Sequence, residues 1–180
     1  RKTAALEPTG TAALDACAVE RVRERIASAR RPVVLVGLEA RRHPVETRRL
    51  VATLGCPVLA TYKGKGVVPD DDPQVVGIFT GGTQEAPCLG RSDLLVMVGL
   101  DPVEMILQPW PYGKPAVEIA AADHPVHYIE PQARAVGPLG LILATLEEGL
   151  RHQSPGWSTE ELAQLRSTMR ARLAYGPVAA

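Results

Sequence analysis

Two continuous apolar runs that end at glycine limit the possible folds of this chain more than any other feature. The run "PVVLVGL" covers residues 32–38, and "DLLVMVGL" covers residues 93–100. Neither run alternates with polar residues, as a strand with one face in water would. We therefore predict two strands that lie inside a sheet and are covered on both faces.

Helical periodicity separates these apolar runs. Residues 12–30 carry apolar side chains every fourth position, and a second amphipathic stretch runs from Pro44 to the residue before Gly55. Proline suits the first turn of a helix and glycine suits the position after its last turn. The remaining predicted elements are strands at 57–61, 75–79, 116–121 and 126–130 and helices at 83–92 and 139–150. This alternation predicts an α/β fold with an open, mainly parallel six-stranded sheet and helices on both faces, Rossmann-like in type.

The two ends of the chain differ from this pattern. Residues 1–11 contain Pro8 and Gly10 and are typical of a linker. Ser158 and Glu161 have the spacing of a capping box, and the charged helix that follows has a thin apolar face. We expect that helix to pack on something outside this chain. With no initiator Met, the chain is expected to be a piece of a longer polypeptide: a linker at 1–11, one domain at 12–150, and at 151–180 a linker helix that leads to a missing domain.

Composition restricts the kinds of partner. Lys and Arg number 20, as do Asp and Glu, so no overall charge favours nucleic acid or a membrane surface. No apolar run approaches the roughly 18 residues of a spanning helix. The three cysteines, Cys17, Cys56 and Cys88, include no C-x-x-C pair, so neither a disulfide framework nor a zinc site is indicated. A cytoplasmic protein is expected.

The segments just after the strands are where an open α/β sheet binds its ligands. The dinucleotide fingerprint fails there, because Gly37 is followed by Leu38 and Glu39 and because Pro69 stands where "KGKG" would need a third glycine. Lys63 and Lys65 could hold a phosphate, although a solvated turn is the interpretation that we favour. No pattern for a catalytic nucleophile or a metal site is evident, so no catalytic residue and no metal ligand is predicted.

Three segments taken together resemble a known family. They are "RRPVVLVGLEARR" at 30–42, "ATLGCPVLATYKGKGVVPDDDPQVVGIFTGG" at 52–82 and "RSDLLVMVGLDP" at 91–102. In order and spacing they resemble the central domain of thiamine diphosphate-dependent enzymes of the acetolactate synthase and pyruvate oxidase type. The resemblance covers residues 12–150. It implies a six-stranded parallel sheet that lies between two other domains.

In that family, one flanking domain binds the pyrimidine ring and supplies a catalytic Glu, and the other binds the diphosphate and Mg²⁺ through a G-D-G...N motif. This chain contains no "GDG" and no Asn. The resemblance thus implies a non-catalytic central domain with a structural role in a 2-oxo acid decarboxylase or carboligase, a lyase or transferase. It also implies that thiamine diphosphate and Mg²⁺ bind to the flanking domains, which are the expected partners, and that the parent is a homodimer or homotetramer. Neither nucleic acid nor membrane is expected as a partner.

Some members of the family bind FAD, or the ADP part of a coenzyme, on this domain. Their carboxylates after the fifth strand correspond here to Ala120 and Ala122, and Gly137-Pro138 stands where those members have G-D, although Asp123 could replace one carboxylate. A free-standing FAD- or ADP-binding α/β module is therefore the alternative that we favour less. Its candidate cofactor-binding residues are Gly37, Thr61, Lys63, Gly64, Gly99 and Asp101.

Overall fold

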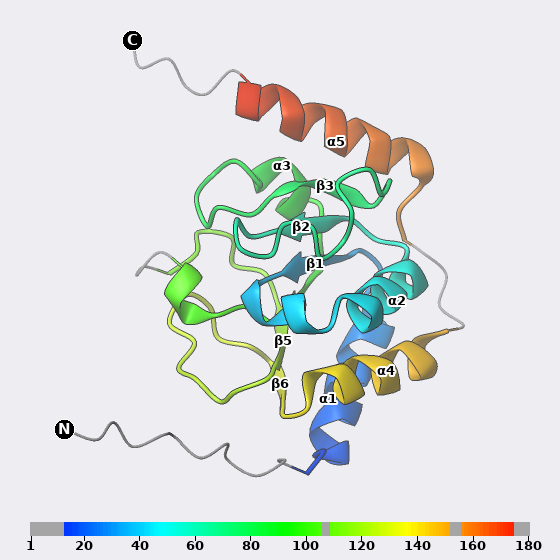
Figure 1. Ribbon diagram of the computed structural model, residues 1–180. Coiled ribbons are helices and arrows are strands. Elements are labelled where there is room, and N and C mark those ends of the chain that lie inside the picture. The colour runs from blue at the N-terminus through cyan, green and yellow to red at the C-terminus, as the bar shows by residue number, and fades with distance from the viewer. Residues whose placement is uncertain (1–12, 106–108, 152–155, 175–180) are drawn as a thin grey trace, which may run out of the picture.

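The computed structural model describes residues 13–105, 109–151 and 156–174. Its centre is one sheet of six strands, all parallel, in the order β3-β2-β1-β4-β5-β6 (Figure 1). The strands are β1 Pro32–Val36, β2 Val58–Ala60, β3 Val75–Ile78, β4 Leu94–Val98, β5 Ala116–Ala120 and β6 Ala133–Val136. The predicted fold class is confirmed.

The central strands are buried along their whole length. Every residue of β1, β4 and β5 is buried, and for β1 and β4 the continuous apolar runs predict this. From β1 the chain adds β2 and β3 on one side, and it then crosses back to add β4, β5 and β6 on the other. The order of the strands therefore reverses between β1 and β4, which is where open α/β sheets bind ligands.

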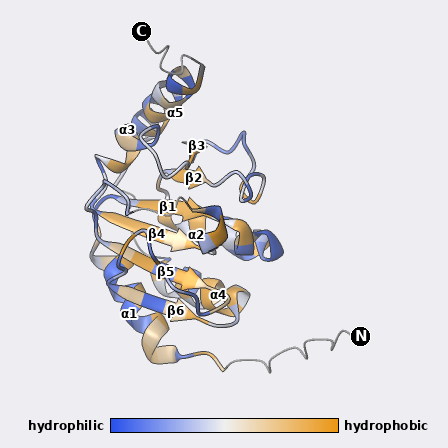
Figure 2. Ribbon diagram, turned by 90° about the vertical axis from the view of Figure 1, so that its left-hand side faces the viewer, coloured by the Kyte–Doolittle hydropathy of each residue, from blue (hydrophilic) through white to orange (hydrophobic). Residues whose placement is uncertain are grey.

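The helices follow from this topology. They are α1 Ala16–Ser28, α2 Pro44–Leu54, α3 Ala86–Leu89, α4 Leu139–Leu150 and α5 Thr159–Ala174, with two short 3₁₀ helices, η1 Leu38–Arg42 and η2 Pro102–Glu104. Right-handed crossovers in opposite directions place their connections on opposite faces of the sheet. Accordingly, α1, α2 and α4 lie together on one side and α3 on the other (Figure 1), with apolar strands between them (Figure 2).

The strand predicted at 126–130 is wrong. That segment is a loop, and the sixth strand is β6, a few residues later. The apolar character of the loop comes from Tyr128, which is buried with its ring stacked on that of Trp110 at 4.5 Å between centroids. The sequence did not predict β6, because the charged Arg134 interrupts the apolar pattern of this strand. In the sheet, Arg134 lies in register with Glu118 of β5.

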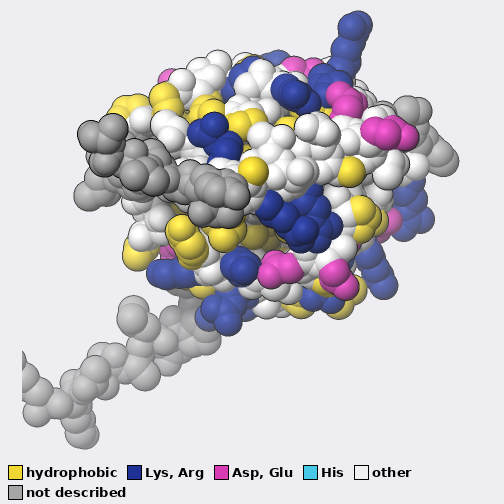
Figure 3. Space-filling model, turned by 90° about the horizontal axis from the view of Figure 1, so that it is seen from above, with side chains coloured by type: hydrophobic (Ala, Val, Ile, Leu, Met, Phe, Trp, Pro, Cys, Tyr) yellow, Lys and Arg dark blue, Asp and Glu magenta, His cyan; other side chains and the backbone are white. Residues whose placement is uncertain are grey.

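The expectation that the last helix packs on something outside this chain is also wrong. The helix α5 lies along the edge strand β3 and beside α3, and its Leu165 and Met169 are almost completely buried. Figure 3, which views the molecule from above, shows Lys and Arg side chains on the outer surface at this end. The predicted domain boundaries, and the further domain after α5, remain predictions.

The turn that leads into α5 is anchored to the start of β1. The indole nitrogen of Trp157 donates a hydrogen bond to the carbonyl of Pro32 at 2.9 Å, and the Arg31 guanidinium lies 3.8 Å from the centre of the indole ring. Arg31 also pairs with Glu161 at 2.7 Å. These contacts attach the start of α5 to the sheet at a point far from it in sequence.

Candidate functional site

The loops after β1 and β4 meet at the point where the strand order reverses. The Gly37 N–H donates to the carbonyl of Val98 at 2.9 Å, and a β-carbon on Gly37 would lie only 2.5 Å from the Gly99 carbonyl oxygen. Gly99 has φ +60°, and a β-carbon there would lie 2.6 Å from the Ala40 nitrogen. Both positions require glycine. The crevice between these strands is therefore closed at its base by backbone contact.

The loop after β2 reaches the same place. Thr61 is buried, and its hydroxyl accepts a hydrogen bond from the Gly64 N–H at 2.9 Å. A β-carbon on Gly64 would lie 2.3 Å from the carbonyl oxygen of Val36, so this loop also rests directly on the end of β1. Four of the six predicted residues, Gly37, Thr61, Gly64 and Gly99, are thus brought together.

The side chain at the centre of these loops is Glu104, which the sequence reading missed. One carboxylate oxygen accepts from the Leu38 N–H at 2.8 Å and from the Asp101 N–H at 3.3 Å, and the other accepts from the Thr61 hydroxyl at 2.6 Å. The loops after β1, β2 and β4 are therefore joined through one carboxylate. Such charge-assisted hydrogen bonds are stronger than bonds between neutral groups.

A local signal for Glu104 does exist. The carboxylate of Asp101 accepts from the Val103 N–H at 2.9 Å, and Glu104 bonds back to the Asp101 N–H, so that the two residues form a capping box on η2. The spacing of Asp101 and Glu104 directly after a buried strand was visible in the sequence. The hydrogen bonds of Glu104 to Leu38 and Thr61 were not visible in the sequence.

The two remaining predicted residues, Asp101 and Lys63, lie farther from the base of the crevice. The Asp101 side chain caps η2. Lys63 is exposed at the rim of a hollow of about 220 Å³ that Glu104 also lines. Its neighbour Lys65 lies 3.3 Å from Asp70 on the surface. Lys63 lines this hollow, whereas Lys65 lines another hollow together with Asp70, so the two lysines do not face one common site.

A second polar group lies at β5 and β6. The carboxylate of Glu118 is completely buried and pairs with Arg134, which also bonds to Asp123 at 3.0 Å and to the His124 carbonyl at 3.0 Å. Asp123, a possible nucleotide contact in the sequence, is therefore engaged by Arg134. This cluster ties the β5–β6 connection to the sheet.

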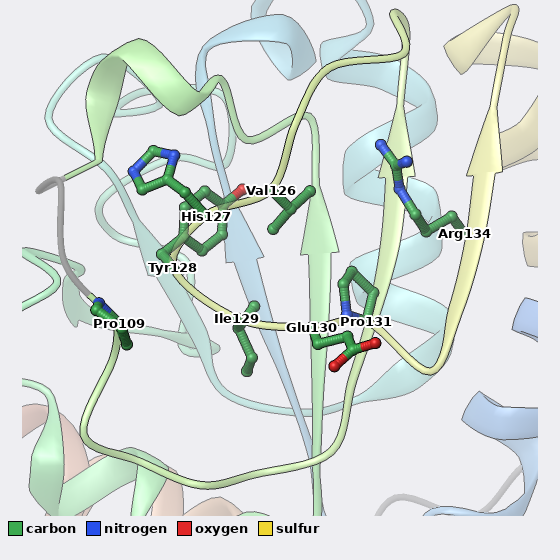
Figure 4. Close-up of a pocket in the computed structure, with 8 residues that line it drawn as sticks. All are labelled: Pro109, Val126, His127, Tyr128, Ile129, Glu130, Pro131 and Arg134. Carbon is green, nitrogen blue, oxygen red and sulfur yellow. The ribbon is translucent and has the colours of Figure 1, made fainter.

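A hollow of about 510 Å³ opens beside this cluster, and Figure 4 shows Tyr128, Glu130 and Arg134 on its wall. Burial raises the pKa of the Tyr128 phenol, and the nearby Glu118 carboxylate raises it further. The phenol therefore stays protonated at neutral pH, which does not suit a general base.

Glu39 lies on another hollow at the same edge of the sheet, beside Arg41 and Arg42. Its carboxylate accepts from the Ala121 N–H at 2.7 Å, and burial raises its pKa above the ordinary value. The backbone after β5, where a nucleotide contact was considered, is therefore held by a side chain of the domain itself.

Within residues 13–105, 109–151 and 156–174, no three side chains of His, Cys, Asp or Glu are placed to hold a metal ion. The described helices include none that is long and apolar enough to cross a membrane.

Comparison with known proteins gives consistent results. The family model for the central domain of thiamine pyrophosphate enzymes matches residues 19–146. The acetolactate synthase of Mycobacterium avium is 31% identical over 175 residues, which cover 87% of this chain and 28% of that protein. The pyruvate oxidase of Lactiplantibacillus plantarum is 32% identical over 87 residues, which cover 47% of this chain and 14% of that protein.

A solved structure shares the fold. The X-ray structure described as that of a thiamin diphosphate-dependent enzyme from Mycobacterium smegmatis superimposes with a TM-score of 0.64 at 25% identity. The match covers 84% of this chain and 30% of that one. The present chain thus spans less than a third of the length of each of these proteins.

Proposed function

This chain belongs to the thiamine pyrophosphate enzyme family as its central domain, and we propose from this that it is the non-catalytic middle part of a 2-oxo acid decarboxylase or carboligase. In such an enzyme the thiazolium of the cofactor supplies the carbanion chemistry, and the protein positions the substrate. The proposed role of this domain is to hold the two cofactor-binding domains in a fixed relation.

The observation that carries this proposal is the position of Glu104. An open α/β sheet that binds a nucleotide keeps the crevice at its reversal point free for the ligand. Here the loops at this point are joined by the Glu104 carboxylate through Leu38, Asp101 and Thr61. A hollow of about 690 Å³ lies beside these bonds, but the groups that a nucleotide would contact there are held within the domain: Glu39 accepts from the Ala121 N–H, and Asp123 pairs with Arg134. This favours a scaffold over a nucleotide-binding module.

The diphosphate and Mg²⁺ do not fit the residues of this chain. The sequence lacks Asn and the "GDG" motif, and the described residues form no metal-binding group. The family implies thiamine diphosphate for the parent enzyme. We propose that Mg²⁺ and the cofactor bind to flanking domains of the same polypeptide.

The reaction, assembly and location of the parent are proposals too. An acetolactate synthase-like parent is supported by the similarity to that enzyme over 87% of this chain. A homodimer or homotetramer follows from the family resemblance. A cytoplasmic location is supported by Cys17, Cys56 and Cys88, all of which are free thiols.

Calorimetry with the 180-residue chain tests the scaffold role. Thiamine diphosphate with Mg²⁺ should give no binding heat, and neither should FAD, ADP or coenzyme A in separate titrations. Micromolar binding of thiamine diphosphate would overturn the non-catalytic role, whereas micromolar binding of FAD or ADP would establish the nucleotide-binding alternative. The reaction is tested with the parent polypeptide, which should release CO₂ from pyruvate only when the cofactor is added.

A further inference from the structure

The large apolar side chains that are exposed in the described part of the chain all lie at one edge of the sheet. They are Val45, Tyr62, Val103, Leu141 and Leu173, with exposed fractions from 44% to 81%. We call this surface the carboxyl-edge face, because it lies at the carboxyl ends of the strands. We propose that the carboxyl-edge face is the docking surface for a flanking domain of the same polypeptide, and that the contact surface of that domain is apolar and carries carboxylates.

The position of each apolar side chain follows from the topology. Tyr62 comes two residues after β2, and Val103 belongs to η2, which follows β4. Val45 and Leu141 lie in the first turns of α2 and α4, which begin after the carboxyl ends of β1 and β6. Leu173, near the end of α5, lines a hollow together with the last residue of β3. The carboxyl-edge face therefore extends across the sheet from β3 to β6, a width that suits a folded domain more than a small ligand.

The opposite edge of the sheet is closed by the chain itself. The Asp93 carboxylate accepts from the Arg30 N–H and from the Arg31 N–H, each at 2.8 Å. The Lys114 ammonium donates to the carbonyl of Ser92, also at 2.8 Å. Within the described residues, this edge exposes no large apolar side chain. Exposed apolar groups that gather on one face only mark that face as an interaction surface.

The free charges of the carboxyl-edge face are mainly positive. Arg41, Arg42 and Lys63 are exposed, and none of them has a hydrogen bond or an ion pair within the described part of the chain. Among the carboxylates, Glu39 accepts a backbone N–H at 2.7 Å, and Glu46 lies half-buried in the first turn of α2. Unpaired cations around apolar side chains are complementary to a partner that carries carboxylates around an apolar centre.

A flanking domain suits this face better than a second copy of the chain. A two-fold symmetric dimer uses the same patch on both subunits, so the free cations of one copy would face those of the other. Like charges at an interface oppose association. The chain spans less than a third of the length of its relatives, so most of their length lies outside the matched part. The inference rests on the proposed function, which makes this chain the middle part of such an enzyme.

Hydroxyl-radical footprinting tests the docking surface. The 180-residue chain and the complete polypeptide that contains it are labelled under the same conditions, and mass spectrometry measures the labelling rate of each residue. Tyr62 is 69% exposed in the chain. Its labelling rate should fall at least about fivefold in the complete polypeptide, because the centre of an interface excludes water. An unchanged rate at Tyr62 would overturn the proposal.

Arg30 is the control for this measurement. It is exposed and lies just before β1, at the opposite edge of the sheet. Its labelling rate should differ by less than about twofold between the chain and the complete polypeptide, because no partner is proposed there. Protection of Arg30 equal to that of Tyr62 would show that the effect is not confined to the carboxyl-edge face, and it would overturn the proposal.

The isolated chain tests the second copy as the occupant. The labelling rate of Tyr62 should not depend on the concentration of the 180-residue chain, and sedimentation should show a monomer. A rate that falls as the chain associates would assign the carboxyl-edge face to a second copy and would overturn the choice of a flanking domain.

Charge reversal tests the complementarity. The double change Arg41→Glu/Lys63→Glu should leave the thermal midpoint of the isolated chain within about 2 °C of the wild type, because both side chains are exposed. In the complete polypeptide it should raise the Tyr62 labelling rate toward that of the isolated chain. The matched control Arg21→Glu/Arg25→Glu lies on α1 beside the start of β6 and should leave the Tyr62 rate unchanged. Equal Tyr62 rates in the two double variants would overturn the proposal.

The CO₂ assay of the complete polypeptide separates this inference from the proposed function. Release of CO₂ from pyruvate together with an unchanged Tyr62 rate would reject the docking surface and leave the proposed function standing. Protection of Tyr62 without release of CO₂ would support the docking surface and reject the proposed reaction.

Discussion

The side chain of Met169 lies directly on the backbone of Gly77. A β-carbon on Gly77 would approach the Met169 Cε atom to 3.0 Å, so the helix α5 fits against the edge strand β3 at the one residue type that has no side chain. An edge strand covered by a helix is protected from pairing with another chain. The packing of α5 therefore covers the β3 edge of the sheet.

Truncating this contact should be costly. Met169 is completely buried, so Met169→Ala should lower the free energy of unfolding by about 2–4 kcal/mol through lost burial and a cavity. Urea unfolding followed by circular dichroism measures the change. Leu173→Ala, on the same helix but 44% exposed, is the matched control and should cost less than about 1 kcal/mol. Equal effects of the two changes would contradict the packing of α5.

The contact between the loops after β1 and β4 should tolerate no side chain. Gly37→Ala places a methyl group 2.5 Å from the Gly99 carbonyl oxygen, where backbone must shift. We expect a loss of about 2 kcal/mol or more in the free energy of unfolding, measured by urea titration. Gly82→Ala is the control, because its β-carbon meets only the Thr80 hydroxyl at 3.3 Å, and it should stay within about 1 kcal/mol of the wild type.

The buried thiols should make stability fall at alkaline pH. Burial raises the pKa of both Cys56 and Cys88 to about 12, whereas an unfolded thiol titrates near about 8.5. The unfolded state thus loses protons first, so the contribution is complete below about pH 8.5 and is lost as pH rises from there toward 12. Urea unfolding at neutral pH and near pH 10 should show the loss. The double variant Cys56→Ala/Cys88→Ala should lose less stability over the same interval, by about 2 kcal/mol per thiol at most; identical pH slopes would contradict the assignment.

Thiol labelling should separate the three cysteines. Cys17 is exposed, while Cys56 and Cys88 are buried and remain protonated at neutral pH. A maleimide reagent under native conditions should therefore modify Cys17 alone, as read by peptide mass spectrometry. Denaturant should release the other two. Native labelling of Cys56 at the rate of Cys17 would show that the core beneath β2 opens freely.

The lysines of "KGKG" should matter little to stability. Lys63 is exposed, and the pair of Lys65 with Asp70 at 3.3 Å lies in water. The double change Lys63→Ala/Lys65→Ala should alter the free energy of unfolding by less than about 1 kcal/mol, because exposed ion pairs contribute little. Chemical denaturation checks this. A larger loss would mean that these side chains support the loop after β2.

Much of the site was accessible from the sequence, but its chemistry was not. Glycines after the apolar runs indicated Gly37 and Gly99, since a loop at a strand end needs close backbone approach. Glu104 was missed because its partners Leu38 and Thr61 are 66 and 43 residues away in the chain. The sequence does not show from which distant N–H groups the carboxylate of a given Glu will accept hydrogen bonds.

The sequence by itself determined the central strands, the fold class and the family resemblance, because strands buried on both faces, such as β1 and β4, are uninterrupted apolar runs in the sequence. Tertiary structure alone decided the rest. It placed the sixth strand around Arg134, whose charge is acceptable there because Glu118 lies opposite it in the register. It packed the thin apolar face of α5 on β3, and it brought Glu104 to donors on three loops. Each of these outcomes depends on a contact between distant residues, which local pattern does not contain.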